Sequence, residues 1–245
     1  MSFLYPEKIV GHEGNLLNQL LLQDHIKRYK FASKLVKHAK VLDIACGNGY
    51  GTNILSKSAK SVVGVDISKE AIDFATKKYE NKNVEFYQSD AKSLNFSASS
   101  FEYVVSFETI EHLSKEGAKE FLEEIKRVLK PSGKLIISTP DNRNASLGKK
   151  PANPYHLQEY SLVEFKNLVS DYFEIINIYG QSFTNKSQIE FVKIFAISIL
   201  KKPVQIAWRI YQKLHIYTGT ISEYHNENKI PWVNIIYAFK PRNIM

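Results

Sequence analysis

The feature that most constrains the fold is a regular alternation between residues 40 and 140, where short apolar runs of strand type are separated by segments with helical spacing. The strand-type runs are KVLDIAC (40–46), SVVGVD (61–66), NVEFYQSD (83–90), FEYVVSF (101–107) and KLIISTP (134–140). The helical patterns lie at 50–59, 68–80 and 114–130. Because strands that alternate with helices form βαβ units, the alternation predicts an α/β fold, a parallel sheet with helices on both faces.

The flanking segments complete a single domain over 1–245. Residues 1–38 are expected to form a helical cover, 39–182 the core, 183–231 a helical insertion or cap, and 232–241 a final strand. Ser161 to Glu164 is a capping-box pattern that opens a helix. FEIINIYG (173–180) and VNIIYAFKP (233–241) have strand character, and Pro131-Ser132-Gly133 is expected to form a turn.

Composition limits the class of protein. With 245 residues and 44% hydrophobic residues the chain can bury a substantial core. The single cysteine, Cys46, excludes an intrachain disulfide and fits a reducing cytoplasm. The N-terminus has no secretory signal pattern, and no apolar run reaches the ~18 residues that a membrane span needs. We therefore expect a cytoplasmic protein, with peripheral membrane association left open.

The charge is carried mainly by lysine. The formal net charge is +8, and only five of the 33 Lys and Arg residues are Arg. Proteins that read nucleic acids depend on Arg for bidentate contacts, so this composition does not favour nucleic acid as the partner. A diffuse lysine excess indicates a solvated surface, which would still attract a phosphate-bearing small molecule.

A glycine-rich loop, ACGNGYGT (45–52), follows the first strand and precedes the first helix of the core. Such a loop lets the backbone approach a ligand. Asp43 is a polar residue in a buried strand, and Asp66 ends the next strand, where a carboxylate can bind ribose hydroxyls. A nicotinamide dehydrogenase competes as an interpretation, but Thr52 stands where that fingerprint requires a third Gly or Ala.

The ordered motifs resemble those of class I S-adenosylmethionine-dependent methyltransferases. The residues that carry the resemblance are VLDIACGNGYGT, VVGVDIS, SDA, FEYVVSFETIEHL and LKPSGKLIISTPDN, and it covers residues 40–180 and the last strand. The resemblance implies a Rossmann-like, seven-stranded sheet of order 3-2-1-4-5-7-6, with strand 7 antiparallel and a helical insertion before it. It also implies that the cofactor is S-adenosyl-L-methionine and the product S-adenosyl-L-homocysteine.

Carried over by position, the resemblance implies a set of cofactor-binding residues. Gly47 and Gly49 would lie alongside the methionine moiety, with Asp43 near its ammonium group. Asp66 would bind the ribose, Ile67 would flank the adenine, and Asp90 would accept a hydrogen bond from the adenine amino group. Phe107 and Glu108 would close the pocket. The full expected set is Asp43, Ala45, Gly47, Asn48, Gly49, Asp66, Ile67, Asp90, Ala91, Phe107 and Glu108.

The stretch SFETIEHL (106–113) places Glu108, Glu111 and His112 at i, i+3 and i+4, on one face if the turn is helical. It follows the fourth strand, at the edge of the sheet where ligands bind in open α/β folds. His112 could be the general base for an acceptor hydroxyl. The three side chains could instead bind a divalent metal, or they could belong to an ordinary surface turn.

A second histidine, His156 in NPYHLQEY (153–160), follows the fifth strand and is expected to face His112. We therefore take His112, His156 and Glu111 as candidate catalytic residues. The candidate metal ligands are Glu108, Glu111, His112 and His156. The E-x-x-E-H pattern resembles ubiquinone-pathway O-methyltransferases and small-RNA 2′-O-methyltransferases, in which such residues bind a divalent ion. The resemblance to the RNA enzymes is incomplete, because we find no RNA-binding segment.

The combination of SFETIEHL with NPYHLQEYSL resembles small methyltransferases of bacterial surface-polysaccharide gene clusters. That resemblance implies O-methylation of a small phosphate-bearing or nucleotide-linked sugar, or a phosphoramidate, in capsule biosynthesis. Two alternatives stay open: a metal-dependent RNA 2′-O-methyltransferase, and a non-catalytic partner subunit that binds S-adenosylmethionine. The apolar segment 187–217 could be a lid, a homodimer face or a membrane-surface helix pair.

Overall fold

The structure, a computed structural model, describes residues 16–145, 151, 153–185, 221–223 and 229–240. The segment 187–217, which was expected to form an inserted helical pair, lies outside the described residues.

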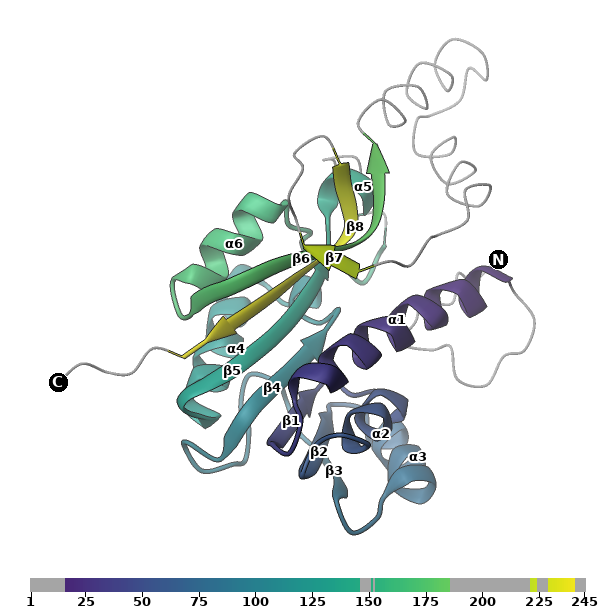
Figure 1. Cartoon of the computed structure of the whole chain (residues 1–245), viewed down its shortest axis with the longest axis vertical. Helices are drawn as coiled ribbons and strands as arrows, with labels where there is room; N and C mark the ends of the chain where they lie inside the picture. The colour runs from purple at the N-terminus through teal and green to yellow at the C-terminus, as the bar shows by residue number, and fades with distance from the viewer. Residues whose placement is uncertain (1–15, 146–150, 152, 186–220, 224–228, 241–245) are drawn as a thin grey trace, which may run out of the picture.

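The core of the chain is one mixed sheet of order β3-β2-β1-β4-β5-β8-β6-β7 (Figure 1). The strands are β1 (Lys40–Ile44), β2 (Ser61–Asp66), β3 (Val84–Gln88), β4 (Phe101–Phe107), β5 (Leu129–Pro140), β6 (Glu174–Asn185), β7 (Ile221–Glu223) and β8 (Lys229–Phe239). The first five pair in parallel, and β8 inserts antiparallel between β5 and β6. This confirms the predicted fold class and the antiparallel last strand.

The sheet has eight strands where seven were expected. The additional strand, β7, pairs antiparallel with β6 through Tyr179 and Gly180, opposite Glu223 and Ser222. It lies in 183–231, the segment that was expected to be a helical insertion or cap. A strand of three residues has too few positions to show a period-2 pattern in the sequence, so only its pairing with β6 reveals it.

Helices cover both faces of the sheet, as the alternation predicted. The helices are α1 (Leu16–Leu35), α2 (Tyr50–Ser56), α3 (Lys69–Tyr79), α4 (Lys115–Val128), α5 (Asn142–Ala145) and α6 (Leu162–Ser170). Helices α1 and α2 pack with Val105, Ile136 and Ile235 on one face, whereas α4 and α6 pack with Leu135 and Ile137 on the other. In Figure 1, α1 crosses in front of the sheet and α4 lies behind it. This burial of apolar side chains on both faces is the main stabilising contribution.

Side-chain caps fix where three of the described helices begin, α3 through Ser68, α4 through Ser114 and α6 through Ser161. The hydroxyl of Ser161 accepts a hydrogen bond from the backbone of Glu164, whose side chain in turn bonds the backbone of Ser161, so the predicted capping box is confirmed. Ser114 caps α4 in the simpler way, by accepting from the backbone N–H of Gly117. Each cap contributes roughly 1 kcal/mol by satisfying backbone N–H groups that have no partner within the helix.

The predicted turn at Pro131-Ser132-Gly133 is instead a bulge within β5. Phe101 pairs with Leu129 and Tyr103 pairs with Lys134, so the register shifts between them. Ser132 takes the left-handed conformation, with φ of 61°, which lets the strand continue past the extra residues. The Pro-Ser-Gly signal therefore marks an interruption of the pairing and not the start of the strand.

The parallel strands place the chemistry at one edge of the sheet. β1 and β4 pair with Ile44 opposite Ser106, so the segments that follow them leave the sheet side by side. Both begin with a non-glycine residue in the left-handed region, Ala45 with φ of 58° and Glu108 with φ of 54°. Backbone strain of this kind gathers at functional sites, which indicates that this edge carries the site.

A hollow of about 570 Å³ lies beside β3 and reaches this edge of the sheet only at Gln88 and Ser89, where β3 ends. Its lining includes Lys40, Ser61 and Ser100, at the amino ends of β1 and β2 and just before β4, and Tyr87 on the outward face of β3. It forms because the connection from β3 to β4 contains no helix to cover that face. No helix within the described residues is long and apolar enough to cross a lipid bilayer.

Two glycines of the loop provide a test of the packing. Both have positive φ, +53° at Gly47 and +77° at Gly49. A Cβ at Gly47 would meet no atom within 4 Å, whereas at Gly49 it would lie 2.7 Å from Cβ of Ala75 and 2.8 Å from the Phe86 ring.

We predict that Gly47→Ala destabilises the fold by about 1 kcal/mol through the left-handed backbone alone. Gly49→Ala should lose roughly 1–3 kcal/mol more, because it also overpacks the α3 contact. Urea denaturation of both variants measures the difference. Equal losses of stability in the two variants would contradict the close approach of α3 to the loop.

Candidate active site

The Asp66 carboxylate ties the glycine loop to the end of β2. One oxygen accepts the backbone N–H of Gly47 at 2.8 Å and the other accepts that of Ser68 at 2.9 Å. Ile67, the residue between Asp66 and Ser68, is 68% exposed, so its apolar side chain is accessible beside the Asp66 carboxylate. The backbone N–H of Ser89 bonds the Asp66 carbonyl, which brings the end of β3 to the same place. The predicted loop, ribose and adenine positions therefore share one edge.

The remaining predicted cofactor residues occupy the same edge. The Asp90 side chain accepts a hydrogen bond from the backbone N–H of Lys92 at 2.9 Å, which stabilises the start of the β3–β4 connection. Gly49 is the left-handed N-cap of α2, and Phe107 is buried at the end of β4. Ala45, Asn48 and Ala91 are half-buried around the loop.

Asp43 lies beneath the loop rather than at its surface. Its side chain is fully buried and accepts hydrogen bonds from the Tyr29 hydroxyl at 3.1 Å and the Thr52 hydroxyl at 2.6 Å. Burial raises the pKa of Asp43 to about 7, although the two hydroxyl donors oppose this shift. Asp43 thus joins α1, β1 and α2, and its expected contact with an ammonium group stays a prediction.

Arg28, on α1, is a buried cation that sequence analysis did not single out. It is 2% exposed, its Nη1 donates to the Gln181 side chain at 2.6 Å, and its Nη2 lies 4.0 Å from a Glu108 oxygen. Its Nε has no hydrogen-bond partner among the described residues. A buried guanidinium with an unused donor is costly unless a ligand completes it, so we count Arg28 as a candidate site residue.

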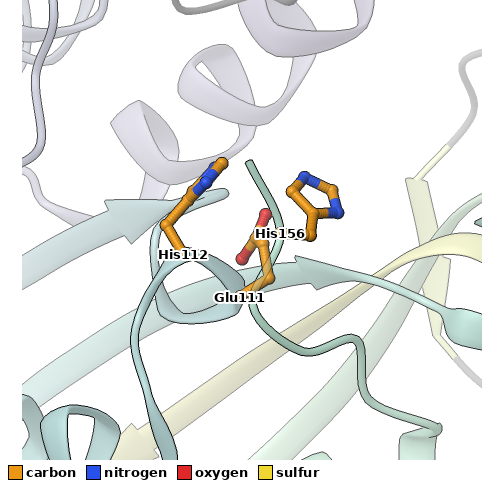
Figure 2. A group of neighbouring side chains, drawn as sticks. All are labelled: Glu111, His112 and His156. Carbon is orange, nitrogen blue, oxygen red and sulfur yellow. The ribbon is translucent and has the colours of Figure 1, made fainter. Parts of the chain in front are cut away.

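Glu111, His112 and His156 form a tight cluster at the end of β4 (Figure 2). The first two stand on the 3-10 turn η2 (Ile110–His112), and His156 comes from the loop after β5. One ligand atom from each side chain lies within 4.8 Å of the others, and the imidazole rings meet edge to face with centroids 4.9 Å apart. Figure 2 shows the carboxylate and both imidazoles pointing into one space.

Backbone hydrogen bonds hold the two segments of the cluster together. The Glu111 carbonyl accepts the N–H groups of Leu157 at 2.9 Å and Gln158 at 3.2 Å. The Gln158 side chain donates to the Leu113 carbonyl at 3.1 Å. His156 therefore lies beside His112, as predicted, and hydrogen bonds to the backbone hold their two segments together.

Hydrogen bonds also fix the form of each imidazole. His112 Nδ1 lies 3.0 Å from the Tyr155 carbonyl, and His156 Nδ1 lies 2.8 Å from a Glu159 oxygen. Because a carbonyl and an ionised carboxylate only accept, both Nδ1 atoms carry the proton. In the neutral rings the lone pair is then on Nε2, available as a base or as a metal ligand.

Glu111 is fully buried, and only one of its oxygens is hydrogen-bonded among the described residues. Oε2 accepts the Thr139 hydroxyl at 3.0 Å, while Oε1 has no hydrogen-bond partner there. Burial, and next the charge of Glu108, holds the pKa of Glu111 well above its ordinary value. A cation between Oε1 and the two imidazoles would offset that cost, so the donor set fits a metal ion.

Glu108 does not join this cluster. It precedes η2 in the left-handed conformation, and its Oε1 accepts the Ser138 hydroxyl at 2.7 Å. Of the four candidate metal ligands, the structure therefore brings three together and directs Glu108 toward Arg28 and the cofactor edge. The i, i+3, i+4 spacing suggested a shared face only because it assumed that the helical turn begins at Glu108.

Comparisons with known proteins find similarity to methyltransferases. Residues 42–137 match the family model described as a methyltransferase domain. A probable S-adenosylmethionine-dependent methyltransferase of Mycobacterium tuberculosis is 35% identical over 132 residues, 54% of this chain and 47% of that protein. A ubiquinone biosynthesis O-methyltransferase of Coxiella burnetii is 32% identical over 111 residues, 44% and 46% of the two chains. The chain spans about half the length of the curated relatives it matches.

Solved structures share the fold across most of the chain. A protein of Pyrococcus horikoshii is similar with a TM-score of 0.59 and 23% identity, over 93% of this chain and 94% of that one. A TehB-like SAM-dependent methyltransferase of Corynebacterium glutamicum has a TM-score of 0.53 and 16% identity, over 87% and 86%. The class is thus defined by fold: a mixed α/β, Rossmann-like methyltransferase fold.

The Asp43 network predicts a pH dependence of stability. The folded protein keeps a proton on Asp43 up to about pH 7, whereas the ordinary value is 3.8. Between these values the folded state binds more protons than the unfolded state, so the free energy of unfolding falls as pH rises.

We expect this contribution to reach at most about 1.4 kcal/mol per pH unit and to end above the folded pKa. Urea denaturation across this range, on the native chain and on Asp43→Asn, measures it. The variant should show a flatter pH dependence. An identical dependence in the two proteins would contradict the account of Asp43.

Proposed function

We propose that this chain is an S-adenosylmethionine-dependent O-methyltransferase whose reaction centre is Glu111, His112 and His156. The observation that carries the proposal is the position of this cluster at the end of β4, beside the strand β1 that leads into the glycine loop. The matched methyltransferase domain model and the relatives named as methyltransferases support it. We propose S-adenosyl-L-homocysteine as the co-product.

The transfer is a displacement at the methyl carbon. A lone pair of the acceptor oxygen forms the O–C bond while the C–S bond breaks, and its electrons pass to sulfur, which becomes a neutral thioether. The acceptor proton must leave as this happens, and Nε2 of an imidazole with Nδ1 already protonated can take it. Because the sulfonium is an activated donor, the protein mainly aligns the two reactants.

The same side chains also fit a divalent metal ion. Two imidazoles and one carboxylate are a donor set that binds divalent ions such as Zn²⁺ and Mn²⁺, and both imidazoles are held by outer partners as metal-bound histidines are. A bound ion would lower the pKa of an acceptor hydroxyl and orient it. We propose that Glu111 Oε1 and the two Nε2 atoms hold this ion, and that Glu108 does not.

For the acceptor we propose a small phosphate-bearing or nucleotide-linked sugar, or a phosphoramidate, used in a surface polysaccharide. The net charge of +8, carried mainly by lysine, supports an anionic acceptor through long-range attraction. The relative from Coxiella burnetii is named an O-methyltransferase, which supports oxygen as the target. An RNA acceptor would instead require steeply salt-dependent binding.

Transfer of labelled methyl from S-adenosylmethionine to nucleotide-linked sugars, phosphoramidates and short RNAs tests both proposals. We expect turnover on a nucleotide-linked acceptor that EDTA abolishes and Mn²⁺ restores. Turnover that is indifferent to EDTA would leave an imidazole as the base and exclude the metal. Label that enters only RNA would overturn the acceptor class.

We further predict that Glu111→Gln, His112→Gln and His156→Gln each lower kcat by roughly 10²- to 10⁴-fold. The affinity for S-adenosylhomocysteine should stay within about twofold, because these side chains are not among those expected to bind the cofactor. His38→Asn is a matched control, since His38 is exposed and Asn tolerates its positive φ. Wild-type turnover in all three variants would refute the assigned centre.

Arg28 suggests how the amino-acid part of the cofactor is bound. Its unused Nε and its position between Glu108 and the Tyr50 side chain place a buried positive charge beside the glycine loop. The methionine moiety carries a carboxylate, which a guanidinium can bind through charge-assisted hydrogen bonds. We propose that Arg28 binds this carboxylate.

Arg28→Met should weaken S-adenosylhomocysteine binding by roughly 10- to 100-fold, the effect of losing a hydrogen bond to a charged group. The ligand 5′-methylthioadenosine, which lacks the amino-acid part, should keep its affinity within about twofold. Calorimetric titration of both ligands separates the two cases. An equal loss for both would mean that Arg28 only supports the fold.

A further inference from the structure

The loop that carries His156 contains a second buried acid that sequence analysis did not select. Glu159 stands three residues after His156, its side chain is 3% exposed, and its Oε1 lies 2.8 Å from His156 Nδ1. Its other oxygen, Oε2, has no hydrogen-bond partner among the described residues. Glu159 does not belong to the cluster of possible ligand atoms, and it contacts that cluster at His156 Nδ1.

This contact determines which nitrogen of His156 faces the site. The ionised carboxylate can only accept, so Nδ1 carries the proton and Nε2 keeps the lone pair. His112 is fixed in the same tautomer, but by the neutral carbonyl of Tyr155. The negative charge of Glu159 behind Nδ1 increases the electron density at Nε2 of His156.

The burial of Glu159 argues against a purely structural contact. A nearly buried carboxylate with one unsatisfied oxygen is costly, and a neutral acceptor at this position would hold the same hydrogen bond at lower cost. The negative charge lowers the energy only if a positive species arises on the other side of the imidazole. A proton taken from the acceptor or a bound divalent ion would both meet that condition.

We propose that Glu159 is the positioning residue of His156: it fixes the Nδ1–H tautomer and supports positive charge at Nε2. This rests on the proposed function for its catalytic consequence, but not for the tautomer itself. Glu159→Gln keeps an acceptor of the same shape and removes the charge, whereas Glu159→Leu removes both. Glu120→Gln, at an exposed position on α4, is the matched control.

The tautomer is measured by nitrogen NMR of protein with labelled histidine, without metal or cofactor, at a pH where the imidazoles are neutral. The His156 signals are assigned by their loss in His156→Gln. We expect the Nδ1–H form in the native chain, in Glu159→Gln and in Glu120→Gln, and a shift toward Nε2–H in Glu159→Leu. An Nε2–H form in the native chain, or no change in Glu159→Leu, would overturn the proposal.

The role of the charge is measured by kinetics on the acceptor found above. We expect Glu159→Gln to lower kcat by roughly 10- to 100-fold with little change in KM for S-adenosylmethionine, as removal of an outer partner of a functional histidine does. Wild-type kcat in Glu159→Gln would overturn the role of the charge. If the native chain methylates no acceptor, the proposed function fails, and the NMR result still decides the positioning role.

Discussion

The arrangement of the site depends on the way the backbone of Glu111 holds the loop after β5. One carbonyl accepts two N–H groups, from Leu157 and Gln158, and this double contact places His156 beside a turn that lies more than forty residues earlier in the chain. The side chain of the same residue is buried against Thr139 at the end of β5. The segments that carry the carboxylate and the two imidazoles are thus joined by main-chain contacts, and the side chains of Thr139 and Glu159 hold Glu111 and His156, which is the preorganisation that a reaction centre needs.

A second set of contacts joins the N-terminal helix to the cofactor edge. Tyr29 donates to Asp43, which also accepts from Thr52, while Arg28 on the same helix turn faces Glu108. The Cα of Gly51 lies so close to Tyr29 that an added Cβ would overlap the ring. Helix α1, β1, α2 and the end of β4 therefore form one connected polar network under the glycine loop. A substitution at any of these positions is expected to alter the conformation of the glycine loop.

Sequence patterns predicted the elements that repeat and the contacts that topology implies. The strand ends follow from βαβ order, because adjacent parallel strands end at one edge, whereas the antiparallel last strand and the sheet order that brings His156 to His112 were implied by the resemblance to methyltransferases. Contacts that depend on one backbone angle were not predictable. Glu108 lies outside the cluster because its backbone is in the left-handed region, with φ of 54°. Nor were partners such as Arg28 and Gln181, which are 153 residues apart and share no local pattern. Glu159 could have been found from its i, i+3 spacing to His156, but such spacings are common on ordinary surfaces.

The most direct test of the account is a crystal structure of the chain grown with Mn²⁺ and S-adenosylhomocysteine, with anomalous data collected to locate the ion. The account predicts one ion bound by Glu111 Oε1 and Nε2 of His112 and His156 at roughly 2.0–2.3 Å, with Glu108 outside its coordination shell. It predicts the cofactor product against Asp66 and the glycine loop, at the same edge of the sheet. No anomalous peak within reach of Glu111, or a product bound at another edge, would contradict it.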